Sequence, residues 1–273
     1  LNGIACCAGS SGPGHVHLIN GLYDAHRSNC PVLAIASTCP SDQFGTGYFQ
    51  ETDPIRLFDD CSGYNQMAVT PAQFARMLPA ALQHAIHRRE VAVVGLPGDV
   101  AASPCAESPG ASGPLPSHGI YRPLDGELRQ LAEMIGSAER ITVFCGIGAR
   151  EAHDEVVRLA AMLKAPVAYT FKAKMEVQYD NPYEIGMTGL LGLPSAYGAM
   201  HESDLLLLLG TDFPYDCFLP SECRIAQVDI RPERIGRRAR ARAGACRGCG
   251  GRLADLASDA ARTFRPDVPP TAG

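Results

Sequence analysis

The sequence predicts an α/β protein made of two doubly wound parallel-sheet units. Near-continuous apolar runs such as PVLAIAS (31–37) and DLLLLLG (204–210) are typical of parallel strands that are buried on both faces. These runs alternate with segments of helical periodicity, which favours β-α-β units with right-handed crossovers. The chain has 273 residues and 46% hydrophobic content, which suits two such units.

Strand and helix alternate from the start of the chain. GIACCAG (3–9) is predicted to form a short strand, and SGPGHVHLINGLYDAHR (11–27) a glycine-rich turn that opens an amphipathic helix. A turn of this kind is suited to meet an anion or a polar ligand. A second strand over 31–37 precedes the loop GYFQET (47–52). This loop combines aromatic and amide side chains, as in the wall of a small polar site, although a surface loop with a packed aromatic also explains it.

The rest of the first domain continues the same pattern. FDDCSGYNQMAVT leads into a third strand. Thr70 is the expected N-cap of a helix that runs to Arg89, with Pro71 at its first position. VAVVGLPGDV (91–100) is predicted to be a strand that ends in a turn, and the Pro-, Ser- and Gly-rich residues 101–121 are interpreted as a linker. The first domain therefore covers 1–100.

The second domain is expected over 122–236. Its predicted helices are GELRQLAEMIGSA, REAHDEVVRLAAMLK and SAYGAMHESD, and its predicted strands lie in RITVFCGIGA, APVAYTF, LLLLLGTDFP and RIAQVDI. The remaining residues, 237–273, begin with RRARARAGACRGCGGR, which shows no hydrophobic period. We expect 237–252 to be irregular and exposed, with a terminal helix in LADLASDAARTF.

Composition excludes several classes. The net charge of −5 argues against nucleic acid as a main partner, and the longest apolar run is too short to cross a bilayer. No signal-peptide pattern is present, and the start at Leu1 suggests a fragment or a processed product. The 11 cysteines are scattered, which favours small buried thiols in a reducing cytoplasm over a disulfide scaffold. The lone pair Cys246 and Cys249 is weak support for zinc.

Four turns of the second domain are expected where ligands bind in such sheets, just beyond the carboxyl ends of strands. They are CGIGAR (145–150), GMTGLLG (186–192), GTDFPYD (210–216) and QVDI (227–230). Each is also explained as an ordinary turn. Together they favour a dinucleotide-sized ligand, although a strict G-x-G-x-x-G is absent.

In combination these segments resemble the thiamine-diphosphate-dependent pyruvate oxidases, and most closely the quinone-dependent pyruvate dehydrogenases that form acetate. The resemblance covers Gly3 to Gly236 in order and spacing, and fades where the basic residues begin, as a reading-frame error would produce. The motifs that carry it are GPGHVHLINGLYDAHR, PVLAIAS, GYFQE, VAVVGLPGDV, GIGAR, DNPYEIGMTGLLG, LLLLLGTDFPY and QVDIRPERIG.

The resemblance implies the latter part of a pyrimidine-binding domain followed by an FAD-binding central domain. It places Gly12, Pro13 and Gly14 near the aminopyrimidine of thiamine diphosphate, and Phe49 and Gln50 in the pyruvate pocket. The FAD-binding residues that it implies are Gly146, Gly148, Ala149, Thr188, Gly189, Leu190, Leu191, Thr211, Asp212, Phe213, Pro214, Tyr215 and Asp229. The family's catalytic glutamate and its magnesium motif match no residue of this chain, so no metal ligand is predicted.

The expected function is that of a fragment of a pyruvate:quinone oxidoreductase, inactive alone. The whole enzyme would use thiamine diphosphate, Mg²⁺ and FAD to convert pyruvate to acetate and CO₂. The resemblance also implies a cytoplasmic homotetramer with peripheral association with the inner membrane, while the electron acceptor, quinone or oxygen, stays open. The alternatives are an acetolactate-synthase-like lyase, a sirtuin-like NAD-dependent deacetylase, and a non-catalytic remnant that binds FAD or nothing. The sirtuin alternative requires two C-x-x-C pairs and a catalytic His motif, which are absent.

Overall fold

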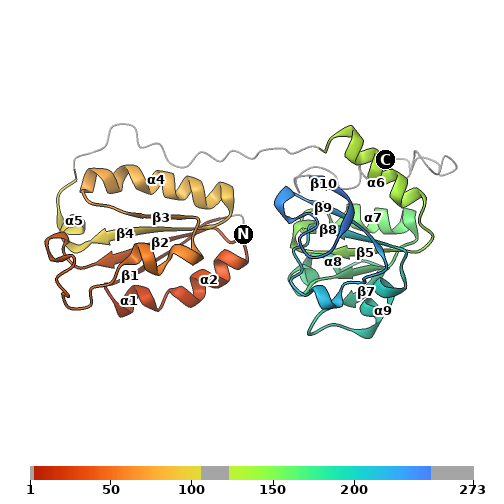
Figure 1. Ribbon diagram of the computed structural model, residues 1–273, viewed down its shortest axis with the longest axis horizontal. Helices are drawn as coiled ribbons and strands as arrows, with labels where there is room; N and C mark the ends of the chain where they lie inside the picture. The colour runs from red at the N-terminus through yellow and green to blue at the C-terminus, as the bar shows by residue number, and fades with distance from the viewer. Residues whose placement is uncertain (1–2, 106–122, 247–273) are drawn as a thin grey trace. The chain divides into compact units, whose positions relative to one another are not determined.

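The chain divides into two compact units, Leu1–His118 and Gly119–Gly273 (Figure 1). Within them the computed structural model describes residues 3–105 and 123–246. Each unit is built around one sheet whose strands are all parallel, with helices packed on both faces. This arrangement confirms the predicted fold class.

The first unit contains a four-stranded sheet in the order β1-β2-β4-β3. Val91 and Val93 of β4 pack with Leu22 on one face, whereas Val94 packs with Ala85 on the other. Figure 1 shows α4 on one side of this sheet and α1 and α2 on the other. The elements are β1 (Ala5–Gly9), α1 (Pro13–Val16), α2 (Ile19–Arg27), β2 (Val32–Thr38), η1 (Ser41–Gln43), α3 (Pro54–Leu57), η2 (Asp59–Cys61), β3 (Tyr64–Met67), α4 (Pro71–Arg88), β4 (Val91–Pro97) and α5 (Gly98–Ala102).

Two helices of this unit test the sequence predictions closely. The N-cap of α4 is confirmed, because Thr70 Oγ1 accepts a hydrogen bond from the backbone N–H of Gln73 at 3.1 Å and Pro71 follows it. The single helix predicted over 11–27 is wrong in one respect, since it breaks between α1 and α2 at His17. The predicted turn after β4 is the short helix α5. Residues 106–121 of the predicted linker lie outside the described residues.

The second unit contains a six-stranded sheet in the order β10-β9-β8-β5-β6-β7. Its central strands β5 and β8 are entirely buried, and Figure 1 shows α6 and α9 on opposite sides of them. Val143 packs toward Leu131 of α6, and Phe144 toward Met200 of α9. The elements are α6 (Asp125–Gly136), β5 (Ile141–Cys145), η3 (Ile147–Ala149), α7 (His153–Leu163), β6 (Val167–Tyr169), η4 (Phe171–Ala173), α8 (Lys174–Val177), β7 (Glu184–Met187), α9 (Pro194–Glu202), β8 (Leu205–Leu209), η5 (Asp216–Phe218), β9 (Arg224–Asp229), η6 (Pro232–Arg234) and β10 (Ala241–Cys246).

The prediction that 237–252 is irregular is wrong for β10. This strand pairs in parallel with β9, with Gly244 opposite Gln227. A Cβ on Gly244 would lie 2.4 Å from Ile235 Cγ2, so the strand is packed closely. The sequence of β10, ARAGAC, contains none of the large apolar residues on which the strand predictions were based. Residues 247–252 lie outside the described residues. Strand β7 also lies where the sequence predicted only a loop.

The cysteines match their predicted character only in part. Cys145 lies in β5, and burial raises the pKa of its thiol to about 12. No disulfide joins the nine cysteines whose side chains are described. Cys6, Cys30, Cys105 and Cys217 are exposed, so the prediction of buried thiols is wrong for these four. None of the described helices has both the length and the apolar character needed to cross a bilayer.

Candidate functional site

Two predicted segments meet at the carboxyl edge of the first sheet. The Gly12–Pro13–Gly14 turn follows β1, and the loop with Phe49 and Gln50 follows β2. Ser11 Oγ donates a hydrogen bond to the backbone oxygen of Gln50 at 2.8 Å. A Cβ on Gly12, whose φ is +64°, would lie only 2.8 Å from Gln50 Cβ. The structure therefore brings the predicted pyrimidine turn and the predicted pyruvate loop into direct contact.

A buried histidine ties these segments to the sheet. His15 has no exposed surface, and its Nδ1 lies 2.7 Å from the carbonyl oxygen of Ser37 while its Nε2 lies 2.6 Å from Thr52 Oγ1. Because a carbonyl only accepts, Nδ1 carries the proton and Nε2 accepts from the Thr52 hydroxyl. Burial lowers the pKa of His15. Sequence reasoning missed this residue, although a histidine directly after a GPG turn was a signal.

We expect the first unit to lose stability as the pH falls below about 6.5, the pKa of an unperturbed histidine. The folded state holds His15 neutral at a lower pKa, so below this pH the unfolded state binds more protons and is favoured. Above it the effect is absent. Urea unfolding followed by circular dichroism between about pH 5 and pH 7.5 measures the slope of the unfolding free energy against pH. His15→Gln should flatten it, whereas the same change at the exposed His17 should not; equal slopes in both variants would contradict the assignment.

The loop after β2 presents an aromatic ring to solvent. Phe49 is 78% exposed, and Gln50 has a φ of +59°. A positive φ is uncommon for a residue other than glycine, and such strain is typical of functional loops. An exposed ring beside an amide side chain can contact both the apolar and the polar part of a small ligand.

In the second unit, two predicted loops meet between β5 and β8, where the order in which the chain adds strands to the sheet reverses. From β5 the chain continues to β6 on one side, and from β8 to β9 on the other, which is where ligands bind in doubly wound sheets. Gly146 and Gly148 follow β5, with Ala149 buried behind them. A Cβ on Gly146 would lie 2.3 Å from the Gly210 carbonyl oxygen. The two glycines thus let the backbone of the loop after β8 approach closely, and their predicted contact with FAD stays a prediction.

The segment after β7 reaches the segment after β8, although β5 and β6 lie between these strands in the sheet. A Cβ on Gly189 would lie 3.2 Å from the ring of Phe213 and 4.0 Å from Tyr215. Thr188 Oγ1 is buried, and no other described residue hydrogen-bonds to it. A buried hydroxyl without a partner is costly, so Thr188 is suited to a ligand that supplies the missing bond. The other residues predicted here, Leu190, Leu191, Thr211 and Pro214, lie in the same two loops.

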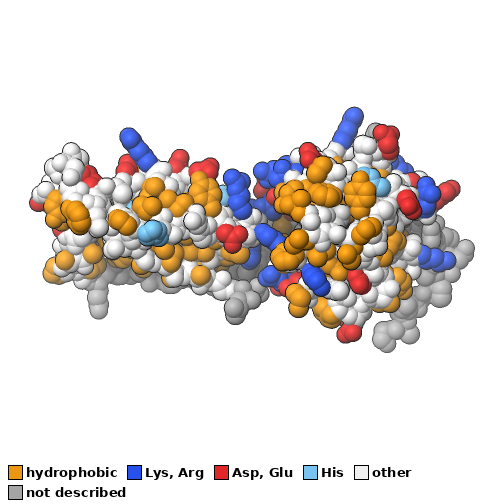
Figure 2. Space-filling view, turned by 90° about the horizontal axis from the view of Figure 1, so that it is seen from below, with side chains coloured by type: hydrophobic (Ala, Val, Ile, Leu, Met, Phe, Trp, Pro, Cys, Tyr) orange, Lys and Arg blue, Asp and Glu red, His pale blue; other side chains and the backbone are white. Residues whose placement is uncertain are grey.

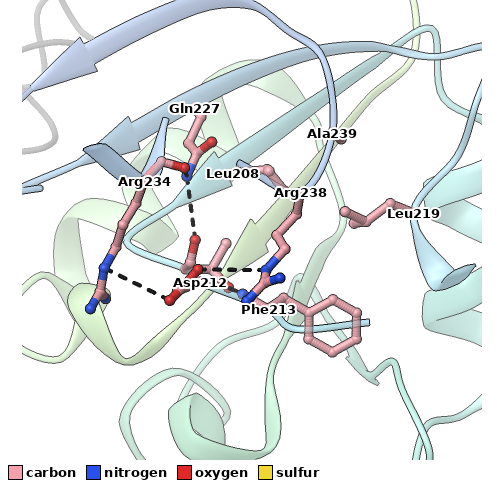
Figure 3. Close-up of a pocket in the computed structure, with 9 residues that line it drawn as sticks. Leu208, Asp212, Phe213, Leu219, Gln227, Arg234, Arg238 and Ala239 are labelled. Carbon is pink, nitrogen blue, oxygen red and sulfur yellow. Dashed lines mark hydrogen bonds and ion pairs between the residues drawn. The ribbon is translucent and has the colours of Figure 1, made fainter. Parts of the chain in front are cut away.

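The two predicted acids differ in their surroundings. Asp229 ends β9, is 5% exposed and accepts a hydrogen bond from the Arg231 backbone N–H at 2.9 Å. Burial raises its pKa. Asp212 instead carries ion pairs to Arg234, Arg237 and Arg238 at 3.6–3.8 Å. Figure 3 shows Arg234 and Arg238 approaching Asp212 from two sides. Asp212 therefore anchors the segment that leads into β10.

The cavity beside Asp212 is too small for a cofactor. Its volume is about 10 Å³, which is room for one water molecule. Its lining is formed by Leu208, Thr211, Asp212, Phe213, Leu219, Gln227, Arg234, Arg238 and Ala239 (Figure 3). A dinucleotide-sized ligand therefore does not fit into this cavity. Among the described residues, no group of three or more His, Cys, Asp or Glu side chains is placed to hold a metal ion.

The carboxyl edge of the second sheet, called the open edge below, carries exposed apolar side chains. Every strand from β5 to β9 is followed by at least one large apolar side chain that is more than a third exposed, and these are Ile147, Phe171, Met175, Leu190, Leu191, Tyr215 and Ile230. Figure 2, which views this unit from below, shows hydrophobic side chains on its surface as well. A patch of this kind marks a surface that a ligand or another part of a protein covers.

Two parts of the chain match domains of one enzyme family. Residues 1–57 match the N-terminal TPP binding domain of thiamine pyrophosphate enzymes, and residues 128–256 match the central domain of the same enzymes. The chain belongs to the thiamine pyrophosphate enzymes. The central-domain match runs through the basic residues and β10, so the expectation that the resemblance ends near Gly236 is wrong, and a reading-frame error does not predict this match.

Individual thiamine pyrophosphate enzymes and other relatives match most of the chain. It is 49% identical over 238 residues to an uncharacterized 42.6 kDa protein in the isoamylase 3′ region of Pseudomonas amyloderamosa, covering 87% of this chain and 60% of that protein. Pyruvate oxidase of Lactiplantibacillus plantarum is 30% identical over 243 residues, covering 86% of this chain and 40% of the oxidase. Acetolactate synthase of Mycobacterium bovis is also 30% identical, over 244 residues that cover 86% of this chain and 39% of the synthase.

A solved structure shows the same fold. It is an X-ray structure from Mycobacterium smegmatis, described provisionally as a thiamin diphosphate-dependent enzyme, with a TM-score of 0.77 and 18% sequence identity. The match covers 93% of this chain and 50% of that one. This chain therefore spans between about two fifths and three fifths of the length of these relatives.

Proposed function

We propose that this chain forms the pyrimidine-binding and central part of an enzyme that oxidatively decarboxylates pyruvate to acetate and CO₂, with electrons passing through FAD to a quinone. The observation that carries the proposal is the contact between the Gly12–Gly14 turn and the Phe49–Gln50 loop at one sheet edge. The resemblance to the pyruvate oxidases implies that these two segments serve the thiamine ring and the substrate. The similarity to a pyruvate oxidase supports the same use here.

The residues present fit both organic cofactors. Gly12, Pro13 and Gly14 would lie beside the aminopyrimidine of thiamine diphosphate, while Phe49 and Gln50 would hold and orient pyruvate. Thiamine diphosphate, when bound, supplies the nucleophilic carbon that lets a 2-keto acid lose CO₂, and FAD accepts two electrons. The protein's task is to orient these groups and to exclude water.

For FAD, the fit rests on the open edge of the second sheet. Thr188 offers an unpartnered hydroxyl, and Leu190 and Leu191, which are 71% and 68% exposed, offer apolar surface. Asp229 lies at a strand end, where its carboxylate can accept hydrogen bonds from ribityl or ribose hydroxyls. Since the described residues include no suitable cluster for Mg²⁺, no step is assigned to that ion.

The second candidate is an acetolactate-synthase-like lyase. It is supported by the match to an acetolactate synthase at the same identity as the pyruvate oxidase. Both enzymes would share the decarboxylation of pyruvate and differ in the fate of the two-carbon unit that remains. HLINGLYD and DNPYEIGMTGLLG resemble the oxidase branch, which is why we place oxidation first.

Product analysis separates the two candidates. The natural gene product, supplied with pyruvate, thiamine diphosphate, Mg²⁺ and FAD, is expected to reduce a quinone-analogue dye and to release acetate. Acetolactate without dye reduction would overturn the proposal and support the lyase.

Gln50→Ala is expected to lower kcat/KM for pyruvate by about 10- to 100-fold, because it removes a hydrogen bond to the substrate. Gln66→Ala is the matched control, since Gln66 is an exposed residue of β3 outside the candidate site. Equal effects of the two changes would contradict the role of Gln50.

A further inference from the structure

The loop that carries Phe49 and Gln50 folds around the carboxylate of Glu51. Oε1 of Glu51 accepts a hydrogen bond from the backbone N–H of Gly45 at 2.6 Å, and Oε2 accepts from Gly47 at 2.9 Å and from Tyr48 at 3.1 Å. Hydrogen bonds to an ionised acceptor are stronger than neutral ones. These three, with the bond from Gly45 first, lower the pKa of Glu51.

Three backbone N–H groups that converge on one point form an anion-binding concavity. Gly45 and Gly47 have φ values of +78° and +74°, a region that glycine adopts far more readily than other residues. The loop thus uses glycine to aim its N–H groups inward and its own Glu51 to fill the concavity. Between η1 and α3 it contains no helix or strand, so these bonds replace the regular hydrogen bonding that other segments have.

Gln50 lies between two parts of the loop that are held by hydrogen bonds. On one side, Glu51 holds the preceding turn; on the other, Thr52 is bonded to the buried His15. Ser11 Oγ donates to the carbonyl oxygen of Gln50 itself. A φ of +59° at this residue persists only when its surroundings hold it. Loss of the Glu51 bonds would release one of these constraints.

We propose that Glu51 is a positioning residue, which sets the orientation of Phe49 and Gln50 toward the substrate without touching it. This inference rests on the proposed function, because only a substrate role for Phe49 and Gln50 makes their orientation matter. The internal contacts of Glu51 stand independently of that function and are tested separately.

Hydrogen exchange tests the contacts on this chain without any cofactor. Glu51→Gln keeps the length of the side chain but replaces one acceptor oxygen with an NH₂ donor. The backbone amides of Gly45, Gly47 and Tyr48 should exchange about tenfold faster or more, since each loses a charge-assisted bond. Asp42→Asn is the matched control, because it removes the same charge from η1, directly before the loop, and no hydrogen bond from the described residues to the Asp42 carboxylate is present. Unchanged exchange in Glu51→Gln would overturn the inference.

If Glu51→Gln does not fold, the unmodified chain still decides the matter. An NMR titration of the Glu51 carboxyl carbon should give a pKa below the usual range for glutamate, as its three donors require. A pKa at the ordinary value would overturn the contacts.

Kinetics of the natural holoenzyme test the positioning role. In Glu51→Gln the KM for pyruvate should rise about tenfold while kcat per bound FAD changes less than about twofold, because the loop binds substrate and the cofactors carry the chemistry. A merely structural role would lower the amount of active enzyme and leave KM unchanged. In Glu51→Gly, sodium formate should lower KM again by filling the concavity.

The outcomes are distinguishable. Faster exchange with an unchanged KM, or no response to formate, would overturn the positioning role and leave the proposed function intact. An unmodified enzyme that does not turn over pyruvate would overturn the proposed function and the positioning role together, whatever the exchange rates show.

Discussion

Replacing Gly146 with alanine is expected to destabilise the second unit by about 3 kcal/mol, the upper range for forcing atoms into a packed site. The new Cβ would lie 2.3 Å from the Gly210 carbonyl oxygen and 2.5 Å from Thr211 Cα. Both are backbone atoms, so no side chain can rotate away. Gly146 N–H also donates to the Leu209 carbonyl oxygen at 2.9 Å, and any shift that relieves the clash strains this bond. Urea denaturation followed by circular dichroism measures the change in unfolding free energy.

Gly198→Ala is the matched control. Gly198 lies inside α9, and a Cβ there would meet nothing within 4 Å. Alanine should stabilise the helix by about 0.5–1 kcal/mol, because glycine loses more backbone entropy on folding. If both variants unfold at the same urea concentration as the unmodified chain, the loops after β5 and β8 are not in the contact described.

The largest effect among side-chain truncations is expected for Phe144→Ala, at about 3–5 kcal/mol. Phe144 lies in β5 with no exposed surface, and its ring packs edge-to-face against Phe213 with the centroids 5.2 Å apart. Removing the ring leaves a cavity in the core and also removes support from the loop after β8. The change should therefore lower the unfolding free energy and speed amide exchange at Phe213.

Phe171→Ala tests whether an apolar side chain of the open edge contributes to FAD binding without contributing to the core. Phe171 is 67% exposed, so its truncation should change the unfolding free energy by less than about 0.5 kcal/mol. FAD fluorescence titration should nevertheless show weaker binding, if the apolar edge holds the cofactor. A loss of stability comparable to that of Phe144→Ala would mean that Phe171 belongs to the core.

The buried strands were predictable from their length and flanking residues. A run such as Leu205–Leu209 has no polar residue to place in water, and because it is short and bounded by Asp204 and Gly210, a strand covered on both faces is favoured over a buried helix. The helix cap at Thr70 was equally clear, since Thr followed by Pro satisfies the first turn of a helix. Strand β10 was missed because its sequence, ARAGAC, contains no large apolar residue, and it lies at the edge of the sheet, where little large apolar surface is needed.

The loops of the candidate site could be predicted from the sequence, but the contacts between them could not. Parallel strands place all their carboxyl ends at one edge, so each predicted loop was expected there. Which loops touch depends on the order of the strands and on how far each loop reaches. The contact of Gly146 with the loop after β8, the arginines around Asp212 and the concavity around Glu51 were therefore not foreseen.

By itself, the sequence determined that this protein has two parallel-sheet units and that it carries the GPG turn, the FQ loop and the glycine turns of a cofactor enzyme. These features are local, because burial pattern and backbone freedom are written in neighbouring residues. Only the tertiary structure decided that His15 joins the turn to Ser37 and Thr52, and that Gly189 meets Phe213. The physical reason is that such contacts join residues far apart in the chain, and their geometry exists only once the sheets have formed.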